Sequence, residues 1–247
     1  MKRSLPATFL FWSLIGCNIF LIIAHIFLRQ SLGFFDLDKE GSLKAVISGF
    51  QLLALGFGSG FVTFLVSRLR ASRPYVMLWA CVSALFFYLA MDDIMMIHER
   101  IGFVLNRWTG LHGTFESFNW LLYFAPLIVL GSCVLILIVR SLWHIDRHAG
   151  IFSSVGVSGF FGTIGIEAIG KQLLAMGALP AYQLSIILEE SILLFGETFF
   201  LIGLFLALMV LFSRAYIRQD QSALPQATIT SLVRIPHCDW GDLKTNG

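Results

Sequence analysis

The sequence predicts an all-α protein that crosses a membrane six times as a single domain, with both termini on the cytoplasmic side. Hydrophobic residues make up 57% of the 247 residues and charged residues only 13%, a composition too apolar for a water-soluble domain. Six apolar runs are each about as long as the ~20 residues that a membrane-spanning helix needs. Most of the basic residues then fall on one side of the predicted topology, which orients the chain.

The first apolar run, after Met1-Lys2-Arg3, is too long for the apolar core of a signal peptide, so we interpret it as a helix. The six helices are expected at about residues 8–28, 43–66, 75–99, 118–139, 151–174 and 183–212, in a transmembrane domain over residues 1–218. Residues 219–247 are polar with two prolines and are predicted to be a mobile cytoplasmic tail.

Two of these runs are rich in glycine. Gly56 and Gly60 form a GxxxG step in the second run, and in the fifth run glycine recurs at every third position from Gly156 to Gly165. Such smooth strips let another helix backbone approach closely. We therefore expect close helix packing at both runs, either within the chain or between copies of it in an oligomer.

Charge placement orients the helices. With both termini inside, 11 of the 17 basic residues face the cytoplasm, as the positive-inside rule requires. They are Lys2, Arg3, Arg68, Arg70, Arg73, Arg140, Arg147, Arg214, Arg218, Arg234 and Lys244. The acids concentrate on the opposite, outward side, where the stretch Asp92 to Glu99 ends the third run.

Counting ~1.5 Å per residue from the inner helix ends puts the acids of four helices at two depths. The deeper level holds Asp92, Asp93, Glu167 and Glu197, and the level nearer the surface holds His98, Glu99, Glu116 and Glu190. Each acid in the deeper level costs about 3 kcal/mol or more to insert. Apart from Lys171, no basic residue lies near enough in the sequence to neutralise them, so we expect either protonation or a bound cation.

Carboxylates and a histidine drawn from several helices are the ligand types of di-iron and di-manganese bundle sites. We therefore predict a divalent metal, with iron, manganese or zinc favoured over copper. The predicted ligands are Asp92, Asp93, His98, Glu99, Glu116, Glu167, Glu190 and Glu197. Protonated, hydrogen-bonded helix packing is the alternative interpretation of the same acids.

Three motifs carry a resemblance to known proteins. They are Phe35-Asp36-Leu37-Asp38-Lys39-Glu40-Gly41, Asp92-Asp93-x4-His98-Glu99 and Glu189-Glu190-x6-Glu197. Together they resemble the LDxEG, DE-x4-HE and EE-x6-E signatures of a group of uncharacterised bacterial multi-pass membrane proteins, with Asp93 in place of the usual Glu. The resemblance covers all six helices and implies a common site, without an activity.

Three functions fit these observations. The first is an outward-facing metal site in a bacterial inner-membrane protein, acting as an oxidoreductase or hydrolase on a lipid or other apolar substrate. The second is a proton- or cation-coupled carrier that uses the same buried acids, and the third is a membrane assembly protein. The lipid bilayer is the expected partner, and the net charge of +2 gives no reason to expect nucleic acid.

Overall fold

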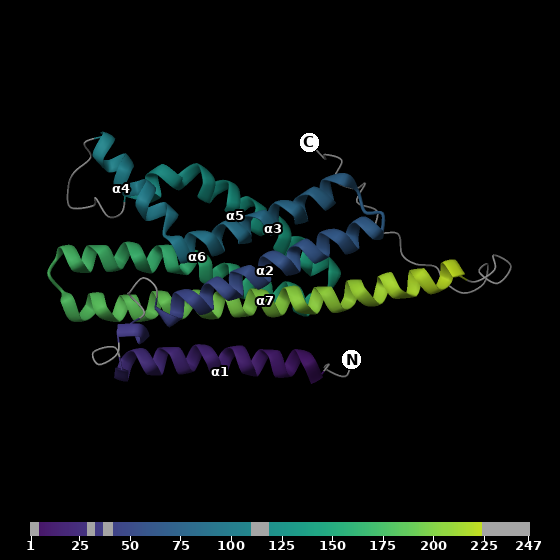
Figure 1. The fold of residues 1–247 in the computed structure, drawn as a ribbon, viewed down its shortest axis with the longest axis horizontal. Coiled ribbons are helices and arrows are strands. Elements are labelled where there is room, and N and C mark those ends of the chain that lie inside the picture. Colours follow the sequence, from purple (N-terminus) through teal and green to yellow (C-terminus); the bar gives the residue numbers. More distant parts are fainter. Residues whose placement is uncertain (1–4, 29–32, 37–41, 110–118, 224–247) are drawn as a thin grey trace.

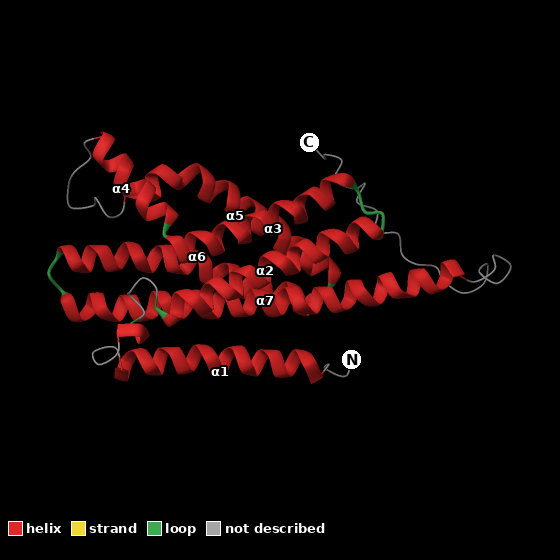
Figure 2. Ribbon diagram, viewed as in Figure 1, coloured by secondary structure: helices red, strands yellow, loops and turns green. Residues whose placement is uncertain are grey.

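The computed structural model describes residues 5–28, 33–36, 42–109 and 119–223, and these residues form helices joined by short turns (Figure 2). The helices are α1 (Leu5–Leu28), the 3-10 turn η1 (Gly33–Phe35), α2 (Leu43–Arg68), α3 (Arg73–Met95), α4 (Ile97–Thr109), α5 (Asn119–Ile145), α6 (Arg147–Ala175) and α7 (Leu179–Ala223). All of these except α4 and η1 are long and apolar enough to cross a membrane. The protein is therefore an all-helical membrane protein with six candidate spans.

Successive long helices run in opposite directions, so the start of α1 and the end of α7 lie at the same end of the bundle (Figure 1). The turns from α2 to α3 and from α5 to α6 lie at this end too, and they carry exposed arginines such as Arg70 and Arg147. We call it the basic end. The opposite end holds the start of α2, the end of α3 and the turn between α6 and α7.

The apolar core lies where α2, α3, α5 and α7 meet. Its fully buried members include Leu55, Val62, Trp79, Phe86, Ile138, Leu142 and Phe200. α6 packs along α7 through glycine: a Cβ added to Gly156 would lie 2.7 Å from the carbonyl oxygen of Gly196. α1 lies on the outer flank of α7 (Figure 1). α7 thus contacts α1, α2 and α6 and forms the centre of the bundle.

Most glycines of the two strips face neighbours within the same chain, whereas a Cβ added to Gly165 would meet nothing within 4 Å. In α2, a Cβ on Gly56 would meet Phe87 of α3 at 3.2 Å, and one on Gly58 would meet Leu204 of α7 at 2.8 Å. A Cβ added to Gly159 of α6 would lie 3.0 Å from the Cα of Gly196. The expectation of close packing within the chain is confirmed, and an oligomer formed through these strips stays a prediction.

The third predicted helix, 75–99, is wrong at its outer end. α3 stops at Met95, and Met96 takes a left-handed conformation (φ 54°) whose N–H donates to the Asp92 carbonyl. A second helix, α4, then covers Ile97–Thr109, most of which was expected to be a loop. Glycine or asparagine usually supplies such a left-handed cap, and their absence here left the break without a sequence signal.

The connection around residues 140–148 is itself almost entirely helical, so the fourth and fifth predicted spans are longer than expected. The sixth also begins earlier and ends later than expected. Asp146 alone separates α5 from α6, and its carboxylate accepts hydrogen bonds from the N–H groups of His148 (2.9 Å) and Ala149 (3.0 Å). This is an N-cap, which satisfies helix N–H groups that have no partner within the helix. The predicted tail from residue 224 onward lies outside the described residues.

Candidate functional site

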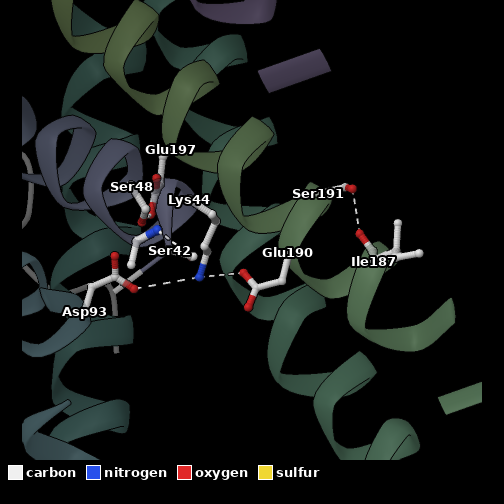
Figure 3. Close-up of polar contacts among 9 residues, drawn as sticks. Ser42, Lys44, Ser48, Asp93, Ile187, Glu190, Ser191 and Glu197 are labelled. Atoms are coloured by element: carbon white, nitrogen blue, oxygen red, sulfur yellow. Dashed lines mark hydrogen bonds and ion pairs between the residues drawn. The ribbon is translucent and has the colours of Figure 1, made fainter. Parts of the chain in front are cut away.

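Lys44 lies at the start of α2 and is the centre of the site. Ser42 caps this helix by accepting a hydrogen bond from the Ala45 N–H (3.4 Å), which puts Lys44 in the first turn. The lysine is only 8% exposed. Its ammonium nitrogen lies 2.6 Å from Glu190 Oε2 and 3.9 Å from Asp93 Oδ1, so it bridges α7 and α3 (Figure 3).

Glu197 lies two turns beyond Glu190 on α7 and is completely buried. The Ser48 hydroxyl, one turn after Lys44 on α2, donates to Glu197 Oε1 (2.7 Å; Figure 3). Glu197 Oε2 has no hydrogen-bond partner among the described atoms. The charges that act on Glu197 are those of Asp93, Lys44 and Glu190, so these four residues form one electrostatic group, the Lys44 cluster.

A closed ring of hydrogen bonds lies next to this cluster. Asn18 Nδ2 donates to Thr198 Oγ1 (2.9 Å), the Thr198 hydroxyl donates to Gln51 Oε1 (2.9 Å), and Gln51 Nε2 donates to Asn18 Oδ1 (3.2 Å). The three residues come from α1, α7 and α2 and are at most 4% exposed. We call this arrangement the Asn18 ring; it is adjacent to Glu197 because Thr198 follows that residue in α7.

A second acidic group lies on the other side of α7. Glu189 is half-buried and is influenced by the charges of Glu167 and Lys171 of α6 as well as by Glu190 and Lys44. Asp92, by contrast, acts on Tyr88 within α3. The described contacts therefore gather Asp93, Glu190 and Glu197 around Lys44, whereas Glu167 belongs with Glu189.

Three predicted ligands cannot be compared with this arrangement. Glu116 lies outside the described residues, and His98 and Glu99 lie in α4 with side chains that the structure does not describe. Within the described part of the chain, no group of three or more His, Cys, Asp and Glu residues is arranged to hold a metal ion. The metal site therefore stays a prediction.

Lys171 is the only base near the buried acids in the sequence, but in the fold Lys44 lies next to two of them. Lys44 is about 50 residues from Asp93 and about 150 from Glu190 in the sequence, and folding brings it to both. A signal was present in α2, where Lys44, Ser48 and Gln51 follow one another at spacings of four and three. That spacing places polar side chains on one face of a helix; in an apolar segment such a face turns inward.

The chain belongs to the family described as "Domain of unknown function (DUF8692)", whose model matches residues 8–208. This match covers the first five spans and most of α7, including every residue of the Lys44 cluster and of the Asn18 ring. It agrees with the predicted resemblance to an uncharacterised family; the three signatures and a bacterial origin stay predictions. No curated protein and no solved structure matches the chain.

Proposed function

We propose that the protein is a proton-coupled carrier and that the Lys44 cluster is its proton-binding site. The observation that carries this proposal is the ammonium group of Lys44, which is buried between Glu190 and Asp93 and near enough to Glu197 for the two charges to interact. Ionisable groups inside a membrane bundle are rare, and they mark proton relays and ion pathways.

The charges of the cluster do not balance. Three ionised carboxylates and one ammonium sum to minus two, and an unbalanced buried charge is strongly unfavourable. Glu197 is the member best suited to hold a proton, because it is 0% exposed and one of its oxygens has no partner among the described atoms. The Ser48 hydroxyl bonded to its other oxygen fixes the carboxyl group in place.

Loss of this proton would change the contacts between helices. An ionised Glu197 attracts the Lys44 ammonium, which also neutralises Glu190 and Asp93. The ammonium would therefore be shared differently among α2, α3 and α7, and a change of ion pairing at a helix interface can drive a shift between two arrangements. Proton binding is in this way coupled to helix movement, as a carrier requires.

Infrared spectroscopy and a transport assay together test this proposal. A protonated carboxyl group has a carbonyl band distinct from that of a carboxylate; we expect this band in the wild type and its loss in Glu197→Gln. Dye-loaded proteoliposomes given a sodium or potassium gradient should move protons with the wild type and with the control Glu189→Gln, but not with Glu197→Gln. An unchanged band and equal proton movement in all three proteins would rule the proposal out.

A metal-dependent enzyme is the second candidate function, because the excess negative charge of the cluster also favours a bound divalent cation. Iron, manganese or zinc would take Glu197 and Asp93 together with His98, Glu99 or Glu116, and would act on an apolar substrate. Lys44 argues against it by lying between Glu190 and Asp93. Elemental analysis of gently purified protein decides: one metal per chain, lost in Glu197→Ala, would replace the carrier proposal.

We place the protein in a bacterial inner membrane with the basic end in the cytoplasm and the Lys44 cluster facing outward. The exposed arginines at the α2–α3 and α5–α6 turns support this orientation. Reporter fusions at Ser72, in the turn from α2 to α3, should report inside, and fusions at Gly177, in the turn from α6 to α7, should report outside. The reverse result would invert the proposed orientation.

A further inference from the structure

We infer that the Asn18 ring is a latch that seats α1 over Glu197. Its members Asn18, Gln51 and Thr198 are then positioning residues for the proton-binding site rather than proton carriers. The inference starts from the direction of the hydrogen bonds, because each side chain donates to the next and accepts from the previous one. Bonds in such a closed cycle strengthen one another in a low dielectric.

The ring also binds the backbone of α7. Asn18 Nδ2 donates to the carbonyl of Leu194 (3.0 Å) in addition to Thr198, so both oxygens that it contacts lie within one turn of Glu197. Polar contacts between helices hold a bundle together in lipid, where apolar burial gives little attraction. α1 is thereby anchored at the point where the buried carboxyl group stands.

The buried face of α1 continues from the ring toward Lys44. Asn18, Leu21, Ala24 and His25 are each no more than 4% exposed, whereas Phe20, Ile23 and Phe27 are at least half exposed. His25 is seven residues after Asn18, and Lys44 is seven before Gln51 on an antiparallel helix, so both lie ~10.5 Å from the ring. This face of α1 therefore extends toward the same end of the bundle as Ser48 and Lys44 of α2, while its main neighbour is α7.

These observations assign a specific task to α1. It contacts the rest of the bundle mainly through α7 and η1, and the polar latch adds hydrogen bonds to the apolar part of that contact. With the latch closed, α1 separates Glu197 from the surrounding lipid. With the latch broken, α1 moves away from α7 and the carboxyl group becomes accessible from the membrane.

Carbodiimide labelling in native membranes tests this inference. Dicyclohexylcarbodiimide dissolves in lipid and reacts with a protonated carboxyl group: the carboxyl oxygen adds to the central carbon, the proton moves to a nitrogen, and acyl transfer to nitrogen leaves a stable N-acylurea without a leaving group. The rate at which the peptide containing Glu197 gains this adduct, measured by mass spectrometry, reports access to the site. The labelling readout rests on the proposed function, whereas the cross-linking of α1 to α7 does not.

Thr198→Val and Thr198→Ser form a matched pair. Valine has the shape of threonine without its hydroxyl, so two bonds of the ring are lost, and we expect labelling to be about fivefold faster or more. Thr198→Ser keeps the hydroxyl and should label like the wild type. Asn106→Ala is the control: this asparagine is also buried but lies in α4, where it accepts a bond from Tyr123, and its loss should leave the rate unchanged.

Disulfide cross-linking between α1 and α7 supplies a readout that does not depend on the protonation of Glu197. The rings of Phe11 in α1 and Phe199 in α7 lie 6.4 Å apart, so a Phe11→Cys/Phe199→Cys pair should cross-link in a chain whose four own cysteines are replaced by alanine. Adding Thr198→Val, or Gln51→Leu if that variant fails to insert, should lower the cross-linked fraction about fivefold. Unchanged cross-linking, or equal labelling rates of Thr198→Val and the wild type, would overturn the latch. If cross-linking falls but no protein is labelled, the latch stands and the result counts against the proton-binding site at Glu197.

Discussion

Glu189 and Glu190 are adjacent in α7, yet they belong to different environments. Glu190 points toward α2 and α3, where Lys44 binds it at 2.6 Å. Glu189 points toward α6, where Glu167 repels it and Lys171 attracts it. Since successive residues of a helix point in directions about 100° apart, a repeated acid in the sequence says little about function until the helix on each side is known.

The two sides of α7 also differ in how they are held. Toward α2, polar contacts connect Glu190 and Glu197 with Lys44 and Ser48, beside the apolar core that the two helices share. Toward α6, the backbones meet at Gly156 and Gly196, which leave no room for a side chain, and the rings of Phe152 and Phe199 pack together nearby. We conclude that the α6 side is built as a fixed support and that the α2 side is where the charge distribution can change.

The largest expected effect comes from removing the cation. Lys44→Met leaves Glu190 and Asp93 without their buried counter-charge, and we expect a loss of about 3–5 kcal/mol in the free energy of unfolding. Lys171→Met, on the other side of α7, should cost about 1 kcal/mol or less. Steric-trap unfolding in bicelles measures both variants.

A double variant sharpens this comparison. In Lys44→Met/Glu190→Gln the carboxylate nearest the lysine is replaced by a neutral amide while Asp93 stays charged, so part of the lost stability should return. If the double variant is as unstable as Lys44→Met alone, the lysine acts through packing of its aliphatic chain and the buried ion pair is not the cause.

A smaller effect is expected at the α6–α7 contact. In Gly156→Ala the added methyl group would lie 2.7 Å from the Gly196 carbonyl oxygen and 2.8 Å from Phe200 Cβ. Overpacking of this kind costs about 1–3 kcal/mol. Gly165→Ala is the matched control, since nothing lies within 4 Å of its added Cβ; equal melting temperatures of the two variants would show that α6 and α7 can separate without cost.

The smallest effect is expected at the second acidic group. Glu189→Gln removes a carboxylate that is half-buried and already repelled by Glu167, so the free energy of unfolding should change by less than about 1 kcal/mol. Proton movement in proteoliposomes should also stay at the wild-type level. A loss of proton movement would extend the proton-binding site to the α6 side of α7.

The spans were predictable because each is a long apolar run, and length and hydropathy are local properties of the sequence. The break at Met96 was not, since a left-handed methionine depends on its surroundings rather than on its own conformational preference. Within the site, Glu197 and Asp93 were predicted because acids in apolar helices stand out. Lys44 was missed because it lies at the edge of its apolar run, where a lysine is unremarkable.

The partners of each acid depended on the arrangement of helices, which a single sequence does not contain. Equal depth predicted that Glu167 and Glu197 share a level, but depth carries no information about direction around a helix axis. Gln51 and Asn18 were absent from the predicted site because uncharged amides give a weak signal. Their role appears only when α1, α2 and α7 are seen together.

The length of α7 has a mechanical consequence. At ~1.5 Å per residue its 45 residues extend about 68 Å, whereas the hydrocarbon layer is only about 30 Å thick. The helix is therefore longer than the bilayer requires, and it reaches past α1 and α2 at the basic end (Figure 1). Because Glu197 and Glu190 are part of the same continuous helix, a tilt or twist of its basic end is transmitted along the helix axis to them. A force applied to this end of α7 therefore acts on the buried carboxyl groups without a connecting loop.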